Sequence, residues 1–205
     1  MKIRCALAVA LTVLAPGLAA AQAGGSDSFG NLFASSAYDF VPLDGSTGVT
    51  GTALSLTVNG QADVALPWAF PFYGGAYNAV SVSANGGLRF QTGATVAGTN
   101  QPIPSATGSI PDVAVFWDFL DPTAGGAVRW FDDAGAGRFI VSWEGVPHFG
   151  GFGAVSVQVH LFPDGGMRLH WQDTLFGNSI YDAGASATAG IQDVVGGTWT
   201  SGNAL

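Results

Sequence analysis

The sequence predicts an all-β protein, an antiparallel β-sandwich of about ten strands with little helix. Short runs of alternating apolar and polar residues recur between clusters of Gly, Pro, Asn and Asp. From Tyr38 onward no window has apolar residues at helical spacing between capping residues. The runs expected to be strands include 53–58, 79–83, 87–90, 112–117, 127–131, 138–143, 154–162 and 167–172.

One hairpin can be specified to the residue. Two alternating runs flank Pro163-Asp164-Gly165. There Pro suits the second position of a type I turn, and Gly suits the left-handed position after it. This turn pairs Leu161 with Met167 and Val159 with Leu169, so both apolar sets face the same side. Turn chemistry and hydrophobic register therefore predict the same hairpin.

A second turn is predicted at Asn85-Gly86-Gly87. A glycine-rich stretch can cradle phosphate, but that use needs a following helix and is usually completed by a lysine. Lys2 is the only lysine, and no helical pattern follows. Asn-Gly between alternating runs is typical of a hairpin turn.

Residues 1–23 have the layout of a secretory signal peptide. Lys2 and Arg4 form a basic start, the apolar run Cys5–Leu14 follows, and Pro16-Gly17 separate it from small residues at a cleavage site. A membrane span needs about 20 continuous apolar residues, more than this run supplies. We expect the mature protein to be secreted, to the periplasm, cell surface or medium, without a membrane span.

Charge then excludes several partners. Without the leader, four arginines stand against fourteen acidic side chains, a net charge of −10, and neither lysine nor cysteine remains. Nucleic acid and anionic lipid need a basic surface, so neither is expected as a partner. An exported chain without cysteine forms no disulfide, so its core alone must hold it together.

The mature chain is predicted to be one domain. Residues 24–37 are small and polar, which predicts a flexible lead-in. No long linker divides residues 38–200, so 38–205 is taken as a single sandwich. A further closing strand is expected after Gly202-Asn203, yet the sequence stops at Leu205. The final sheet edge is therefore predicted to be open to an added strand, or the chain to be part of a longer protein.

Several ordered blocks carry a family resemblance. The blocks are Leu66-Pro67-Trp68-Ala69-Phe70-Pro71-Phe72-Tyr73-Gly74, Val80-Ser81-Val82-Ser83-Ala84-Asn85-Gly86, Val113-Ala114-Val115-Phe116-Trp117-Asp118-Phe119-Leu120-Asp121-Pro122 and Phe139-Ile140-Val141-Ser142-Trp143-Glu144-Gly145-Val146-Pro147. Together, over roughly residues 38–195, they resemble the nidogen-like extracellular domain and its bacterial secreted relatives. The resemblance implies a non-catalytic β-rich module of adhesion or matrix contact. It departs from the family pattern at Phe119, where a second acidic residue is expected.

Two metal sites are considered. Asp118 and Asp121, with Asp112 nearby in sequence, offer hard oxygen ligands for calcium. The alternative is that these carboxylates bond local backbone amides in turns. His160 and His170 are diagonal neighbours on the outer, solvated face of the predicted hairpin, so with His148 they are considered for zinc. The alternative is that these histidines are ordinary polar residues of the surface.

Three tryptophans are expected in the core and two are considered as sugar platforms. Trp117, Trp143 and Trp171 lie in apolar alternation, which favours burial. Trp130 and Trp199 are less constrained, and an exposed indole can stack on a sugar ring.

The function expected is binding rather than catalysis. The chain has no Gly-x-Ser-x-Gly, His-Glu-x-x-His or Walker motif, and Glu144 is its only glutamate. We expect an extracellular adhesion or interaction module without a cofactor, binding a protein or matrix partner through loops such as 91–111 and 146–153. The alternatives are a carbohydrate-binding module and an accessory domain of a larger secreted hydrolase.

Overall fold

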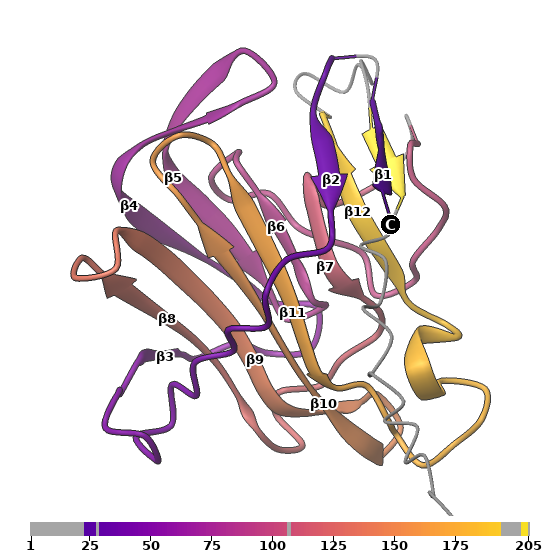
Figure 1. Cartoon of the computed structure of the whole chain (residues 1–205). Helices are drawn as coiled ribbons and strands as arrows, with labels where there is room; N and C mark the ends of the chain where they lie inside the picture. Colours follow the sequence, from indigo (N-terminus) through magenta and orange to yellow (C-terminus); the bar gives the residue numbers. More distant parts are fainter. Residues whose placement is uncertain (1–22, 28, 106–107, 194–201, 205) are drawn as a thin grey trace, which may run out of the picture.

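Two antiparallel sheets pack face to face, as the sequence predicts (Figure 1). The computed structural model describes residues 23–27, 29–105, 108–193 and 202–204. Within them the five-stranded sheet has the order β11-β10-β9-β8-β3 and the six-stranded sheet the order β13-β12-β7-β6-β5-β4. The elements are β1 (Ala23–Ser26), β2 (Leu32–Ala34), β3 (Thr52–Leu54), β4 (Gln61–Phe72), β5 (Gly75–Ser83), β6 (Gly87–Arg89), β7 (Val113–Trp117), β8 (Ala127–Asp133), β9 (Arg138–His148), β10 (Phe152–Leu161), β11 (Met167–Asp173), the short 3-10 helix η1 (Asp182–Gly184), β12 (Thr188–Gln192) and β13 (Gly202–Ala204).

The core fills the space between the sheets. Val82 of β5 and Val159 of β10 are fully buried members of one apolar cluster. Trp143 of β9 belongs to it as well, and its indole N–H donates to the Ser83 carbonyl at 2.9 Å, which links the two sheets. Burial of each large apolar side chain is worth about 1.5–3 kcal/mol. With a single cysteine in the sequence, this core holds the sandwich together without an internal disulfide.

The predicted hairpin is confirmed in its register. Leu161 pairs with Met167 and Val159 with Leu169. The Gly165 amide donates to the Phe162 carbonyl at 3.0 Å and closes the turn. The turn at 85–86 is confirmed too, since β5 and β6 pair antiparallel on either side of it.

The outer face of this hairpin is not solvated, and that expectation is wrong. His160 is fully buried and His170 is only 3% exposed. Residues 38–44, here called the strap, run across the outer face of the five-stranded sheet on the way from β2 to β3 (Figure 1). The strap covers both histidines: the Asp39 amide lies 3.5 Å from His170 Nδ1.

Side chains of the sheet bind the strap as a neighbouring strand would. The Val41 amide donates to Gln158 Oε1 at 3.0 Å, and Gln158 Nε2 donates to the Val41 carbonyl at 2.7 Å. Two residues on, the Leu43 amide donates to Glu144 Oε1 at 2.7 Å. Buried backbone groups need such partners, so these bonds fix the path of the strap.

Gln158→Met is expected to loosen the strap. It leaves the amide and carbonyl of Val41 without their partners, which costs about 1–3 kcal/mol for a buried polar group. The free energy of unfolding should fall by that amount, and chymotrypsin should cut faster after Tyr38 and Phe40. Gln172→Met, at an exposed position of β11, is the matched control. Equal cleavage of the two variants would contradict this role for Gln158.

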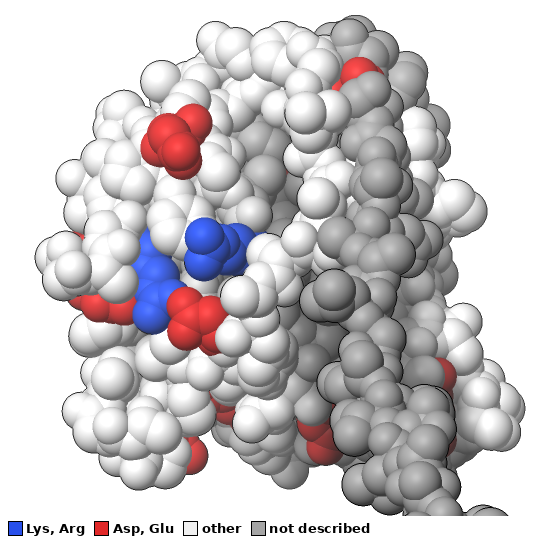
Figure 2. Space-filling model, viewed as in Figure 1, with Lys and Arg blue, Asp and Glu red and all other residues white. Residues whose placement is uncertain are grey.

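Basic side chains on this face lie in one small area, with acidic side chains beside them (Figure 2). Arg138 pairs with Asp39 of the strap and, at 2.8 Å, with Asp133. Its Nη1 also lies 3.2 Å from His160 Nδ1. His160 Nε2 lies 2.7 Å from Gln158 Oε1. Since Gln158 Oε1 only accepts and Arg138 only donates, both contacts fit the neutral histidine with its proton on Nε2.

The start of the domain differs from expectation. The lead-in, expected to be flexible over 24–37, contains the paired strands β1 and β2. Between them the Asp27 carboxylate accepts the amides of Gly30 and Asn31 and the hydroxyl of Tyr73. At the other end β12 pairs with both β7 and β13, and β13 is the last strand on that side of the six-stranded sheet within the described residues. The predicted signal peptide lies outside the described residues, apart from Ala23.

Candidate functional site

The three aspartates considered for calcium do not share a site. The Asp121 carboxylate accepts the Thr123 amide at 2.9 Å and its hydroxyl. The Asp112 carboxylate accepts the Phe90 amide at 2.6 Å and lies 3.6 Å from Arg89 Nε. Nowhere in the described part of the chain do three or more His, Cys, Asp or Glu side chains gather as metal ligands. Asp121 thus bonds the amide of its own turn, as the alternative interpretation proposed, whereas Asp112 bonds an amide that is distant in sequence.

Asp118 has a different role, because its carboxylate connects three segments of the chain. Its carboxylate accepts the Phe119 amide at 2.8 Å and the Ser186 hydroxyl at 2.5 Å. The other contact is with His148 Nε2 at 3.5 Å. Because the Ser186 hydroxyl bonds the carboxylate and not the imidazole, the contacts do not have the order of a Ser-His-Asp triad. Asp118 thus ties the end of β7 to the end of β9 and to the segment before β12.

A layer of aromatic rings begins at His148, which contacts Asp118. His148 stacks on Tyr181 at 4.0 Å between ring centroids and meets Phe176 edge-on at 5.3 Å. Phe119 stacks on Phe149 at 4.2 Å. The Phe149 amide also donates to the Phe119 carbonyl at 2.7 Å, which fixes that pair. Aromatic pairs in such geometries add about 0.5–1.5 kcal/mol beyond their burial, so the layer is firmly held.

The segments that supply these rings also carry large apolar side chains that are exposed. They are Phe149 (43% exposed), Phe152 (38%), Leu175 (60%) and Ile180 (67%). We call these four residues the hairpin-tip surface, because two lie at the tip of the β9–β10 hairpin and two in the loop that follows β11. Single exposed apolar residues are ordinary, but a group of them at one end of a soluble domain marks a binding surface.

A close backbone approach brings the two loops together. The Gly153 amide donates to the Phe176 carbonyl at 2.8 Å. A Cβ on residue 153 would lie 2.5 Å from that carbonyl oxygen, so only glycine fits. Phe152 then meets Tyr181 at 5.1 Å. The β9–β10 turn and the loop after β11 therefore form one continuous surface.

The sequence predicted half of this surface. The segment 146–153 was expected to be a partner-binding loop; the structure has only the turn 149–151 there, which carries Phe149, and Phe152 begins β10. The 174–187 loop was missed, because its apolar residues follow neither strand nor helix spacing. Their presence in a loop that is otherwise small and polar was the available signal. The other expected loop, 91–111, instead buries Val96 and Ile110 against Trp117.

The tryptophans divide differently from expectation. Trp117 and Trp143 are buried, as predicted. Trp171 is 40% exposed, so its assignment to the core is wrong. It lies on the edge strand β11, where only part of the ring is covered. Its indole N–H donates to the Val115 carbonyl at 2.9 Å. Trp130 is half-buried and stacks one ring face on Phe139. Trp199 lies outside the described residues.

Comparison with known proteins identifies the family. The family model described as NIDO related matches residues 32–204, which include both sheets and the hairpin-tip surface. No curated protein and no solved structure matches the chain. No helix in the described residues is long and apolar enough to cross a membrane. The matched range covers most of the sequence and agrees with the resemblance in its motifs, so the chain belongs to the NIDO-related family, whose domains are in general extracellular β-rich modules.

Proposed function

We propose that the protein is exported and acts as a non-catalytic interaction module that binds another extracellular protein through the hairpin-tip surface. One observation carries this proposal: two loops hold four large apolar side chains exposed at one end of a rigid sandwich. Family membership supports an extracellular setting, and the signal-like leader supports export.

The surface has the build of a binding hot spot. Phe149 rests on Phe119, and Phe152 rests on Tyr181, so both exposed rings are pre-positioned by half-buried neighbours. A side chain already held in place loses little conformational entropy on binding. Aromatic residues at the centre of an interface often contribute most of its affinity.

Charge indicates the character of the partner. Asp173 and Asp182 lie in or beside the loop that carries Leu175 and Ile180, where they accept backbone amides. No lysine or arginine occurs between 169 and 193. We therefore expect a partner with an apolar centre and a basic rim, because opposite charges around an apolar contact favour association.

The first test compares surface variants in binding. Mature protein, residues 24–205, is immobilised and titrated with the surface-protein fraction of the source cells. Phe149→Ser and Ile180→Ser are expected to weaken retention of the bound protein, Phe149→Ser by about 10- to 30-fold, the effect of losing a hot-spot side chain. Both residues are exposed, so the thermal unfolding midpoint should change little.

Leu32→Ser is the matched control. Leu32 is exposed but lies on β2, in the separate two-stranded sheet. It should bind as the wild type does. Equal binding by all four proteins, or loss only in Leu32→Ser, would contradict the proposed surface.

A further inference from the structure

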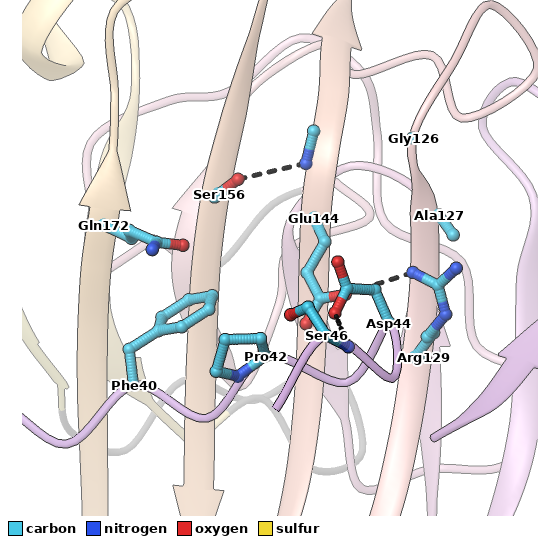
Figure 3. A pocket seen from close by; sticks show the side chains of 11 residues that line it. Phe40, Pro42, Asp44, Ser46, Gly126, Ala127, Arg129, Glu144, Ser156 and Gln172 are labelled. Atoms are coloured by element: carbon cyan, nitrogen blue, oxygen red, sulfur yellow. Dashed lines mark hydrogen bonds and ion pairs between the residues drawn. The ribbon is translucent and has the colours of Figure 1, made fainter. Parts of the chain in front are cut away.

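A second feature of the molecule, a groove, remains without a role. It lies beside the strap on the outer face of the five-stranded sheet and has a volume of about 480 Å³. This is within the range of about 300–1,000 Å³ typical of small-molecule sites. Figure 3 shows it extending along the strap across several strands, from Gln172 past Ser156 and Glu144 to Arg129. We call it the strap groove.

One side of the groove is apolar. Phe40 and Pro42 of the strap present their rings next to each other, as Figure 3 shows. The sheet opposite carries small residues, Gly126, Ala127 and Gly145. A flat ligand can therefore lie against the sheet with one face toward the Phe40 ring.

Hydrogen-bond donors and acceptors line the rest of the groove. Glu144 and Asp44 supply carboxylates, while Arg129, Gln172 and Ser156 supply donors. Arg129 Nη1 bonds Glu144 Oε2 at 3.1 Å, which leaves further N–H groups of the guanidinium to donate. The Ser156 oxygen accepts the Gly145 amide at 3.1 Å and keeps its own proton for donation.

These groups are held in place before any ligand arrives. Glu144 Oε1 accepts the Leu43 amide and the Ser142 hydroxyl. Asp44 Oδ1 accepts the Ser46 amide at 2.8 Å. Hydrogen bonds from Ser46, with the nearby Arg129 charge, keep the pKa of Asp44 below its usual value, so it stays an acceptor at neutral pH.

We propose that the strap groove binds a neutral polysaccharide, a ligand beyond the protein partner proposed above. Sugar rings have an apolar face, which fits Phe40, and hydroxyl groups that donate and accept, which fit the mixed polar lining. The elongated groove suits several linked rings rather than one. The lining has two carboxylates and a single guanidinium, and the whole chain is acidic, so anionic polysaccharides are repelled.

Affinity electrophoresis tests this proposal. Mature protein is run through native gels that contain a soluble neutral polymer, mixed-linkage β-glucan, xyloglucan, galactomannan or dextran, or the anionic polymer alginate. The wild type should be retarded at least 3-fold more strongly by one neutral polymer than by alginate. Phe40→Ala and Gln172→Ala should each abolish that retardation.

Two matched variants control for general effects. Tyr38→Ala removes an exposed ring from the same strap, outside the groove lining. Asn78→Ala removes an exposed amide from β5 of the other sheet. Both should be retarded like the wild type, and circular dichroism should show all four variants folded. No retardation by any neutral polymer, or retardation that Phe40→Ala and Gln172→Ala retain, overturns the proposal. The protein-binding test of Phe149→Ser is independent of this result.

Discussion

Acid should weaken the fold strongly, by about 1.4 kcal/mol of unfolding free energy for each pH unit between about pH 6 and pH 4. The cause is His160, which lies fully buried beneath the strap. Burial lowers its pKa from 6.5 to about 3, and the nearby His170 and Arg138 charges add to the effect. Over that range the unfolded chain binds a proton at this histidine and the folded chain does not. Stability is therefore lost as the pH falls from about 6.5 toward 3.

Most charged neighbours of His160 also lower its pKa. Burial also lowers the pKa of His170. Arg138 and Arg168 oppose a positive charge on His160, whereas Asp39 favours it. Hydrogen bonding from Arg138 keeps the pKa of Asp39 below its usual value despite burial, so that carboxylate contributes stability that is lost only in stronger acid.

Urea unfolding at pH 7, 6, 5 and 4 checks this expectation. The wild type should lose about 2–3 kcal/mol between pH 7 and pH 4 through His160 alone. His160→Gln, which does not titrate, should be less stable at pH 7 but show a shallower dependence on pH. The same slope in both proteins would contradict a buried neutral histidine beneath the strap.

Gly86→Ala is expected to prevent stable folding. Gly86 has φ +73°, in the left-handed region, and a Cβ there would lie 2.0 Å from the Phe116 carbonyl oxygen. That carbonyl belongs to β7, and the Gly86 carbonyl itself accepts the amides of Val115 and Phe116 at 3.0 Å. Since backbone cannot move aside as a side chain can, the two strands must separate. We expect a loss of more than about 3 kcal/mol of unfolding free energy.

Gly93→Ala separates the two causes of that loss, the left-handed backbone conformation and the clash of the new Cβ with β7. Gly93 has a nearly equal φ of +71°, but a Cβ there meets nothing within 4 Å. It should cost only about 1–2 kcal/mol, the penalty of a left-handed alanine. Chemical denaturation of both variants gives the comparison. Losses of similar size would show that the approach of Gly86 to β7 contributes little.

Local sequence patterns predicted strands in which apolar and polar side chains alternate between the two faces. In the hairpin of β10 and β11, alternation and the Pro-Asp-Gly turn agree, and its register was right. β4 was not among the predicted strands, and it contains Pro67 and Pro71. As the edge of its sheet, β4 can hold prolines, since an edge strand has amides that need no neighbour.

Long-range contacts account for what the sequence did not predict. The strap lies about 100 residues or more from Glu144 and Gln158 along the chain, and no local pattern announces that it covers their sheet. His160 and His170 therefore looked like solvated polar residues. Likewise Asp118 was noticed as a charged residue after a strand, but its partners His148 and Ser186 are distant in sequence. Only the fold brings these groups to the base of the hairpin-tip surface.

Site-specific photo-cross-linking tests the central proposal most directly. A benzophenone-bearing phenylalanine analogue replaces Phe149 in one protein and Tyr38, an exposed aromatic residue on the strap, in another. Irradiation with the surface-protein fraction should give a discrete protein adduct from position 149 and none from position 38. An adduct from position 38 alone, or no protein adduct from position 149, would contradict a protein-binding role for the hairpin-tip surface.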